Sequence, residues 1–412
     1  MPPTRNLPRL RAIAAALTAA VAISLAGAAT ASADSIVYLK DGNVWLANPD
    51  GTNEHQVTDD GTQSVPYTSV SQADDGTIVV GHGTEIERLQ QNGQIISSFD
   101  PPASIDSTSA PIDGLPQDVA VSPDGSIVSF VYYTVTCPVG ASCGSRQTLM
   151  YSYADRATDP DTFGVHWNFT NPSWVTGERV LFHGGYGRSA NFDSPGGGDD
   201  DSIHWFDDTD ENGSTKDLDD GELTRTGDRL AALRDYGSNL NVAVYAVSGN
   251  AQSGAPPEAP KIACTIGPSE TLKSPSWSPD GKSLAFSSGS GIETVPLQNV
   301  TPGECAGATS TTVVIPGGSE PDWGPADVNP KPIEQGGPGT PGTKKGCKVP
   351  KVVGMKLGAA KAKLKKAGCK TKVKRVRSTR VKVGRVIKTS PKAGKRAKPG
   401  GKVTVTVSRG RN

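Results

Sequence analysis

Several motifs and residue types are absent or scarce in this chain of 412 residues, and each absence narrows the possible functions. No Gly-x-Ser-x-Gly sequence occurs, so one common serine-hydrolase context is missing. The five histidines are scattered and never have the His-Glu-x-x-His spacing of a zinc peptidase: His55, His82, His166, His183 and His204. Beyond residue 33, no long apolar run predicts a transmembrane segment. The sequence therefore gives no positive evidence for either class of hydrolase or for a membrane span in the mature chain.

Acidic residues are missing from one part of the chain only, which divides a formally neutral protein into two charged parts. Residues 344–412 contain 25 Lys or Arg and no Asp or Glu, a net charge of +25. Residues 34–343 contain 42 acidic and 14 basic residues, a net charge of −28. Such asymmetry is typical of two domains with different electrostatic partners. The Pro- and Gly-rich residues 327–346 are expected to form an extended linker between them.

Residues 1–33 have the composition of a secretory signal peptide. Arg5, Arg9 and Arg11 precede an apolar, Ala-rich run, and the Ala-Ser-Ala sequence at 31–33 fits the small-residue cleavage rule. A membrane anchor is the alternative, but the apolar run is short for a span. We therefore expect a secreted mature protein that begins near Asp34.

Six cysteines in an exported chain favour disulfides over metal or redox chemistry. Their connectivity does not follow from sequence, so proximity along the chain is the only guide. On that basis we expect Cys137–Cys143 within one loop, Cys264–Cys305 across adjacent repeats, and Cys347–Cys369 in the basic C-terminal region.

A strand–turn–strand motif recurs through the acidic part of the chain. Its best copies are Pro-Ser-Trp-Ser-Pro-Asp-Gly at 275–281 and Val-Ala-Val-Ser-Pro-Asp-Gly at 119–125. Proline and Asp-Gly favour a tight turn, and the following apolar residues alternate as in a half-buried strand. The turn glycines of five copies lie 49 to 54 residues apart: Gly76, Gly125, Gly177, Gly227 and Gly281. This period predicts the four-stranded blades of a β-propeller.

The two ends of the repeat region complete one another. Residues 36–58 predict strands without a leading Trp motif, and Pro321-Asp322-Trp323 is a copy of that motif without strands after it. The sequence therefore predicts a mainly β fold, a six-bladed β-propeller closed by N- and C-terminal strands that share one blade. Over residues 34–326 the repeats resemble the Pro-Asp-Gly repeats of TolB-like propellers. This resemblance implies a central channel that binds a protein segment or a small ligand, and it does not imply catalysis.

The conspicuous side chains of the repeats are interpreted as structural. Five tryptophans are expected to pack between blades: Trp45, Trp174, Trp205, Trp277 and Trp323. The Asp-Gly pairs are interpreted as turn residues. His183, which follows Leu181 and Phe182, is interpreted as an ordinary strand-end residue.

One acidic loop has the spacing of a calcium site. Asp208, Asp210 and Asn212 stand at positions one, three and five, glycine stands at position six, and Asp219 stands at position twelve. Lys216 at position nine and the short side chain at position twelve depart from the pattern. The alternative is a solvated acidic turn that follows a strand at 203–206. Ca²⁺ is the only cofactor that the sequence suggests.

Residues 347–412 predict a second, small α+β domain. A helix is expected at 357–367, and the period-two alternation at 403–408 predicts a strand. Val-Pro-x-Val-Val-Gly-Met at 349–355, Ser-Pro-x-Ala-Gly at 390–394 and Val-Thr-Val-Thr-Val-Ser-x-Gly at 403–410 resemble a PASTA domain. The resemblance implies one helix on a three-stranded sheet and a role at the cell wall, often as a sensor of peptidoglycan fragments. This copy stands alone and lacks acidic residues, unlike typical members of that family.

The charge of this domain leads independently to an anionic partner. An exported domain with a net charge of +25 meets the carboxylates and phosphodiesters of wall polymers before it meets nucleic acid, for which no specific binding is expected. The residues expected to bind a polyanion are Lys363, Lys365, Lys366, Lys374, Arg375, Arg377 and Arg380. In the alternative, the basic tail docks on the acidic propeller of the same or another chain.

Two functions from different classes remain open. The first is a secreted, wall-associated, non-enzymatic binding or scaffold protein, in which the propeller presents a ligand-binding face and the tail associates with peptidoglycan or anionic wall polymers. The second is an envelope enzyme, a hydrolase or lyase, whose propeller acts on wall polymers, lactones or peptides. A charged cluster around the channel favours the enzyme, and an apolar or plugged channel favours the binding protein. The sequence itself favours the binding protein.

Overall fold

The computed structural model of the protein divides into two compact units, residues 1–331 and 332–412. The residues that it describes are 34–137, 140, 142–184, 189–195, 202–209, 213–249, 251–253, 256, 258–331, 347–367, 369–395, 397 and 402–410. The predicted signal peptide and most of the predicted linker, residues 332–346, lie outside this set. Among the described residues, no helix has the length and apolar character needed to cross a membrane.

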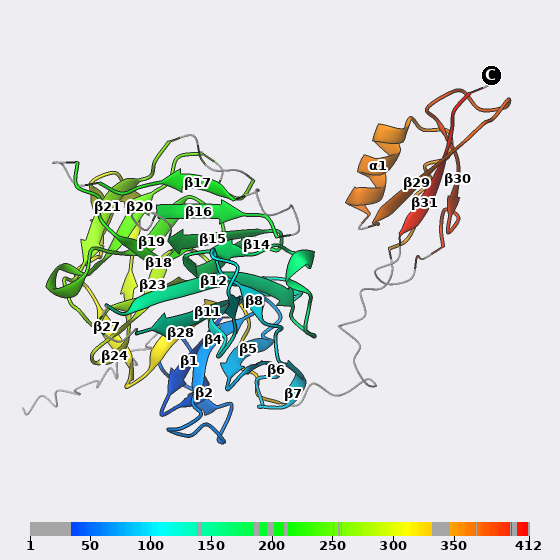
Figure 1. The fold of residues 1–412 in the computed structure, drawn as a ribbon. Helices are drawn as coiled ribbons and strands as arrows, with labels where there is room; N and C mark the ends of the chain where they lie inside the picture. Colours follow the sequence, from blue (N-terminus) through cyan, green and yellow to red (C-terminus); the bar gives the residue numbers. More distant parts are fainter. Residues whose placement is uncertain are drawn as a thin grey trace, which may run out of the picture. The chain divides into compact units, whose positions relative to one another are not determined.

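The described part of the first unit contains six antiparallel four-stranded sheets, which we call blades 1 to 6 (Figure 1). Blade 1 consists of β28 (Ser319–Gly324), β1 (Ser35–Lys40), β2 (Asn43–Ala47) and β3 (His55–Gln56). Blade 2 consists of β4 (Tyr67–Gln72), β5 (Ile78–His82), β6 (Glu85–Leu89) and β7 (Ile95–Phe99). Blade 3 consists of β10 (Gln117–Val121), β11 (Ile127–Thr136), β12 (Gly144–Tyr153) and β13 (His166–Trp167). Blade 4 consists of β14 (Phe169–Thr176), β15 (Arg179–Gly184), β16 (Ser189–Asp193) and β17 (Ile203–Phe206). Blade 5 consists of β18 (Leu218–Leu223), β19 (Arg229–Arg234), β20 (Asn241–Ala246) and β21 (Lys261–Ile266). Blade 6 consists of β22 (Lys273–Trp277), β23 (Ser283–Ser288), β24 (Gly291–Pro296) and β27 (Thr312–Pro316).

Short elements lie between the blade strands. The two-stranded pair β8 (Ser104–Ile105) with β9 (Pro111–Ile112) lies between blades 2 and 3. The pair β25 (Gln298–Thr301) with β26 (Glu304–Ala306) lies within blade 6, and the 3₁₀ turns η1 (Pro160–Thr162) and η2 (Gly237–Asn239) lie within blades 3 and 5. The first strand of each blade, which we call the inner strand, contacts the inner strands of two neighbouring blades. The inner strands in order are β28, β4, β10, β14, β18 and β22, and β22 in turn contacts β28.

Blade 1 is assembled from both ends of the repeat region, as the sequence predicts. Strand β28 pairs antiparallel with β1, so that Ile36 lies opposite Trp323 and Ser35 lies opposite Gly324. In Figure 1 the yellow β28 lies beside the blue β1. The outer strand β3 covers only His55–Gln56, near the end of the region 36–58 for which strands are predicted.

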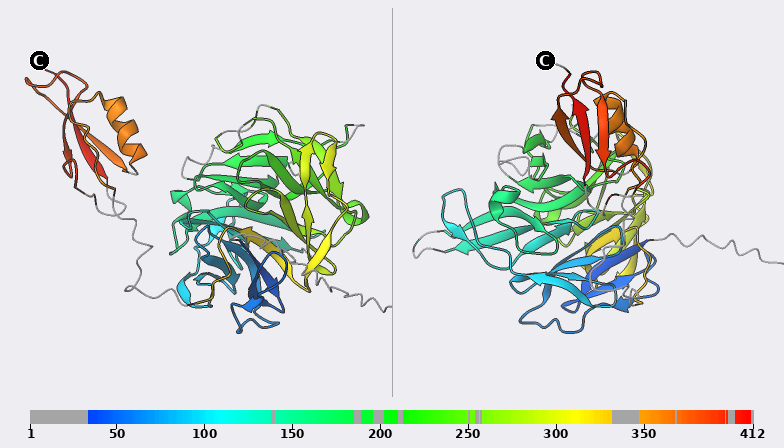
Figure 2. Two further views of the ribbon diagram at one scale, coloured as in Figure 1. Left: turned by 180° about the vertical axis from the view of Figure 1, so that it is seen from behind. Right: turned by 90° about the vertical axis from the view of Figure 1, so that its right-hand side faces the viewer.

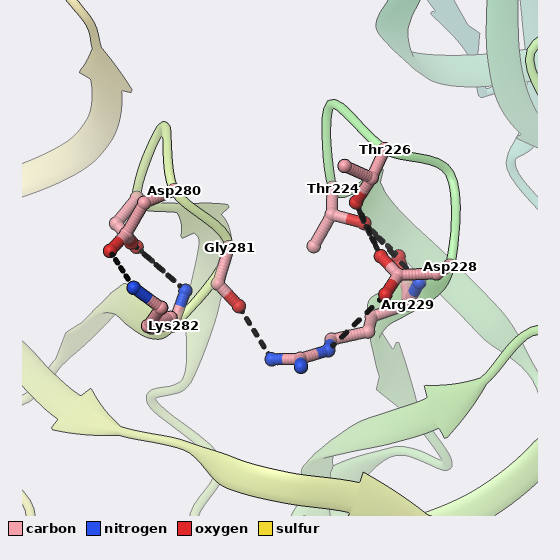
Figure 3. Close-up of polar contacts among 8 residues, drawn as sticks. Thr224, Thr226, Asp228, Arg229, Asp280, Gly281 and Lys282 are labelled. Atoms are coloured by element: carbon pink, nitrogen blue, oxygen red, sulfur yellow. Dashed lines mark hydrogen bonds and ion pairs between the residues drawn. The ribbon is translucent and has the colours of Figure 1, made fainter.

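The Pro-Asp-Gly segments form the turns between the first two strands of a blade. In blade 6, the Gly281 N–H donates to the Ser278 carbonyl at 2.8 Å, and Gly281 has a φ of 69°, which glycine adopts without steric cost. The Ser278 hydroxyl donates to Asp280 Oδ1 at 2.8 Å. Figure 3 shows that this turn is also linked to blade 5, because Arg229 Nη1 donates to the Gly281 carbonyl at 2.7 Å. The Asp-Gly pairs are therefore turn residues.

The repeat tryptophans pack between blades. Trp277 is 2% exposed and lies in a cluster that includes Leu233 of β19 and Leu284 of β23, and its Nε1 donates to the Glu222 carbonyl of blade 5 at 3.1 Å. Trp174 Nε1 donates in the same way to the Ala120 carbonyl of blade 3 at 3.0 Å. Trp45, Trp205 and Trp323 likewise pack in or against interblade clusters.

The three disulfides are those expected from the sequence. Cys137–Cys143 closes a short loop, Cys264–Cys305 joins β21 to β26, and Cys347–Cys369 lies in the second unit. The predicted linker begins at residue 327, but Gln91 bonds both the Asp327 carbonyl and the Asn329 N–H, so this part belongs to the first unit.

The second unit has the predicted α+β fold. Helix α1 (Leu357–Lys366) is followed by β29 (Thr371–Val376), β30 (Val386–Ser390) and β31 (Val403–Ser408). The sheet order is β29-β31-β30, with β29 parallel and β30 antiparallel to β31 (Figure 2). Ala360 and Leu364 of the helix are fully buried in the core of this unit.

Trp277→Ala tests the packing role of the repeat tryptophans. We expect it to lower the free energy of unfolding by about 3–5 kcal/mol, because it removes a buried indole from the contact between blades 5 and 6. Denaturant unfolding measures this change. Tyr236→Ala is the matched control, since Tyr236 is 70% exposed and its loss should cost about 0.5 kcal/mol or less. An unchanged unfolding midpoint in Trp277→Ala would contradict the packing role.

Candidate functional site

The inner strands of all six blades line one cavity of about 410 Å³, which we call the channel cavity. Its lining is mostly polar, although the faces between blades are apolar. The polar side chains occupy two equivalent positions that recur in each inner strand. These two positions form two tiers around the cavity.

The first tier is built by a backbone irregularity that recurs in five blades. In each of these five inner strands, the pairing register with the second strand of the blade shifts at the same place. One non-glycine residue at each shift has a φ between 47° and 53°: Asp118, Asn171, Asp220, Ser274 and Glu320. A positive φ is strained for such residues, and a bulge of this kind re-aims a side chain. All five residues line the channel cavity.

The second tier lies two residues further along each strand and connects neighbouring blades. Its side chains accept hydrogen bonds from the backbone of the next inner strand at four junctions. These bonds are Gln72 N–H to Asp322 Oδ2 at 2.8 Å, Val121 N–H to Ser71 Oγ at 3.1 Å, Trp277 N–H to Glu222 Oε1 at 3.1 Å, and Trp323 N–H to Ser276 Oγ at 3.0 Å. Three of these four acceptors, Ser71, Glu222 and Asp322, also line the cavity, so residues of its wall link neighbouring blades.

Residues of the first tier also bond across blade junctions. Asp220 Oδ2 accepts the Ser274 N–H at 2.6 Å, and Asp118 Oδ2 accepts the Asn171 N–H at 3.4 Å. The Ser274 hydroxyl donates to Glu320 Oε2 at 3.2 Å. These bonds fix the orientation of the carboxylates around the cavity.

The charges that line the cavity do not balance. Five carboxyl groups face two basic side chains, Arg225 and Lys273. Arg225, in the turn between β18 and β19, forms an ion pair with Asp74, in the turn between β4 and β5. Its Nη1 lies 2.6 Å from Oδ1 of Asp74. The cavity is therefore strongly acidic when its carboxyl groups are ionised.

Burial raises the pKa values of these carboxyl groups. The pKa of Glu222 rises to about 8, first through burial and then through the nearby charge of Asp322. Burial, together with the charges of Glu320 and Asp219, raises the pKa of Asp118 to about 6 and that of Asp220 to about 8. Burial also raises the pKa values of Glu320 and Asp322. Asp118, Asp220 and Glu222 therefore titrate near neutral pH.

The predicted calcium loop lies partly outside the described residues, which omit Asp210 and Asn212. Asp208 Oδ2 accepts from the Tyr245 hydroxyl at 2.9 Å and pairs with Arg234, so a guanidinium already neutralises this carboxylate. Asp219 lies in β18 and accepts from the Asn171 side chain. Within the described ranges, no group of three or more His, Cys, Asp or Glu side chains is arranged to hold a metal ion. The calcium site stays a prediction.

The histidines do not contribute to the cavity, since none of its lining residues is a histidine or a cysteine. His183 is the penultimate residue of β15, near the strand end as predicted, and is 0% exposed. Burial lowers its pKa to about 4, which keeps the imidazole neutral at physiological pH.

The seven residues predicted to bind a polyanion are all exposed on the second unit. Lys363, Lys365 and Lys366 occupy the last turn of α1, where the helix dipole favours cations. Lys374 and Arg375 lie on β29, which contacts α1. Arg377 and Arg380 follow this strand.

The acidic tiers are the functional feature that sequence reasoning missed. The signal was present, because the second-tier position is polar in five of the six copies, as in Ser276-Trp277 and Asp322-Trp323, and Ala120 is the exception. A second polar residue stands two positions earlier in each copy. Alternation alone does not distinguish a side chain that faces a channel from one that faces solvent.

Comparison with known proteins identifies the second unit. Residues 348–409 match the PASTA domain family. This match covers the helix and all three strands of the second unit, which is hereafter called the PASTA-like domain. No curated protein matches the chain in sequence.

Several solved structures resemble this chain at low sequence identity. Acinetobacter baumannii TolB has 16% sequence identity and a TM-score of 0.41, over 70% of this chain and 66% of TolB, so the chain spans slightly less than two thirds of that protein. The periplasmic gluconolactonase of Pseudomonas aeruginosa has 10% identity and a TM-score of 0.43, over 70% of this chain and 98% of the enzyme. Kuenenia stuttgartiensis hydrazine synthase has 11% identity and a TM-score of 0.37, over 62% of this chain and 70% of that chain. Similarities this low transfer no activity to this chain.

The raised pKa of Glu222 predicts how stability depends on pH. The folded state holds the proton of Glu222 more tightly than the unfolded state, so its contribution is complete below the unfolded pKa of about 4.3 and is lost as pH rises through about 8. We therefore expect the melting temperature to fall between about pH 5 and pH 8, and Glu222→Gln to flatten this dependence. Thermal melts at several pH values measure both effects.

Glu178→Gln is the control for this measurement, because Glu178 is an exposed residue in the turn between β14 and β15 of blade 4. It should leave the pH dependence unchanged. Identical pH profiles for the unchanged protein and Glu222→Gln would contradict the assignment of this proton to Glu222.

Proposed function

We propose that the protein is an extracytoplasmic, non-enzymatic binding protein. Its PASTA-like domain associates with peptidoglycan or another anionic wall polymer, and its propeller holds a ligand in the channel cavity. The observation that carries the wall-binding part is the charge of the second unit, because residues 344–412 contain 25 basic residues and no carboxylate side chain to neutralise them. The match to the PASTA domain family supports the same partner.

Three observations support a location outside the cytoplasm. The six cysteines form three disulfides, which persist in oxidising compartments. The N-terminal residues have the composition of a signal peptide. The PASTA-like domain fits a chain that works at the cell wall.

The channel cavity supports binding more strongly than catalysis. Its carboxylates Asp118, Asp220, Glu222 and Asp322 each accept a backbone N–H from the next blade, so they serve the architecture of the propeller. No histidine or cysteine lines the cavity to act as a base or nucleophile. A concave cavity with several placed polar groups can orient a ligand.

An envelope hydrolase or lyase is the second candidate, and one observation favours it. The cavity is charged rather than apolar, and the pKa values of about 6 for Asp118 and about 8 for Glu222 suit proton transfer near neutral pH. The two candidates differ in a measurable outcome. The binding protein leaves wall fragments, peptides and lactones unchanged, whereas the enzyme converts one of them and loses this activity in Glu222→Gln.

Wall binding is tested by neutralising the seven exposed basic residues in the full mature chain. Substitution of Lys363, Lys365, Lys366, Lys374, Arg375, Arg377 and Arg380 by Gln should lower the affinity for purified cell wall by about tenfold or more at an ionic strength of about 0.1 M, because these charges lie within a Debye length of a bound polyanion. Sedimentation with purified wall measures the bound fraction.

The control keeps the charge and changes only the side chains, with Arg at the three Lys positions of α1 and at position 374, and Lys at the three Arg positions. This variant should bind almost as well as the unchanged chain. Equal binding by the Gln variant would contradict wall binding by this surface. Loss of binding in both variants would instead indicate recognition by specific side chains, as expected for a peptidoglycan fragment.

A further inference from the structure

We propose that the channel cavity binds an organic cation, through a primary ammonium or guanidinium group. The group belongs either to a small amine or to a Lys or Arg side chain of a peptide segment that enters the channel. This inference rests on the proposed role of the propeller as the ligand-binding domain and names the chemical class of its ligand.

Carboxyl groups outnumber basic groups in the wall of the cavity. Asp118, Asp220, Glu222, Glu320 and Asp322 line it, and of the two basic lining residues Arg225 is paired with Asp74. A carboxylate has about four acceptor sites, of which a backbone N–H from the next blade uses one. A ligand that brings positive charge and several N–H donors would satisfy acceptor sites that the interblade bonds do not use.

The same wall contains a hydroxyl group without a hydrogen-bond partner among the described residues. Ser69 lines the cavity at the first-tier position of blade 2 and is 5% exposed. Its Oγ has no hydrogen-bond partner among the described residues. Buried hydroxyl groups are normally hydrogen-bonded, so an unpaired one at the wall of a cavity indicates a missing partner. This observation is independent of the carboxylates.

The placement of the carboxyl groups favours a polyatomic cation over a metal ion. A metal ion such as Ca²⁺ requires several oxygen ligands that converge at about 2.3–2.6 Å from one point. The cavity carboxylates come from three inner strands, β10, β18 and β28, and among the described residues no three acidic side chains converge in this way. Separate acceptors distributed around a cavity of about 410 Å³ suit a polyatomic cation with several donors.

Three tryptophans provide a measurable signal for ligand binding. Trp174, Trp277 and Trp323 belong to the wall of the cavity, although their rings pack between blades. Ligand binding next to this wall is therefore expected to change their fluorescence.

The test uses the full mature chain and four probes. Butylammonium and propylguanidinium are the free cations, a capped Ala-Arg-Ala peptide is the segment, and propylurea is the neutral analogue of propylguanidinium. Tryptophan fluorescence and calorimetry measure binding. We expect the three cationic probes to bind and propylurea to bind at least tenfold more weakly. An affinity for the peptide at least tenfold above that for propylguanidinium assigns the site to a peptide segment, and comparable affinities assign it to a small amine.

Two variants localise the binding. Glu222→Gln removes a carboxyl group that can ionise when a cation binds, while its side-chain oxygen still accepts the Trp277 N–H, and we expect at least a fivefold loss of affinity for propylguanidinium. Ser69→Ala removes the unpaired hydroxyl, and we expect about a threefold loss. Glu178→Gln, outside the cavity, is the control and should bind as the unchanged chain does. Melting curves show that each variant is folded.

The proposal is overturned if none of the cationic probes binds, if propylurea binds equally well, or if neither cavity variant changes the affinity. These outcomes are separable from a failure of the proposed function, since wall sedimentation reports on the PASTA-like domain and probe binding reports on the cavity. The variant with Gln at the seven basic tail positions should bind the probes as the unchanged chain does. Much tighter probe binding by this variant would contradict a free cavity and indicate that the chain's own tail fills it.

Discussion

The propeller depends on one recurring interaction, a backbone N–H of one inner strand that donates to a polar side chain of the preceding blade. It occurs at four junctions, with Asp322, Ser71, Glu222 and Ser276 as acceptors. Buried N–H groups must be satisfied, and an inner strand that faces a cavity has no further strand to bond on that side. A side chain from the neighbouring blade provides the acceptor and fixes the position of one blade relative to the next.

This interaction also determines the chemistry of the cavity. Because the acceptors at two junctions are carboxylates, and bulges add Asp118, Asp220 and Glu320, the same residues that join the blades make the cavity acidic. Burial of several carboxyl groups together is unfavourable and raises the pKa of Glu222 to about 8. A cationic ligand relieves this cost. In the second unit the charge has the opposite sign and is exposed, so the two units attract ligands of opposite charge.

Much of the fold follows from the sequence, because its signals are local and repeated. Turn chemistry at Asp280-Gly281 and the period of the glycines predict the blades, and the Trp motif at 321–323 predicts the blade shared by both ends. The PASTA-like motifs predict the helix and three strands of the second unit. The residues of the cavity are harder to predict from the sequence, because the positive φ of Asp118 or Glu320 arises from a bulge that no local motif indicates. The sequence places the start of the linker at residue 327, before the end of the first unit. Hydrogen bonds from Gln91, which is distant in sequence, attach Asp327 and Asn329 to that unit.

Hydrogen exchange at the interblade amides tests the central claim most directly. If side chains of the preceding blades hold the N–H groups of Gln72, Val121, Trp277 and Trp323, these four amides should exchange slowly and with similar protection, through unfolding of the propeller as a whole. Glu222→Ala, which removes one acceptor, should accelerate exchange at Trp277 more than at Val121 on the far side of the propeller. Fast exchange of these amides in the unchanged protein, or no selective effect at Trp277, would contradict the account.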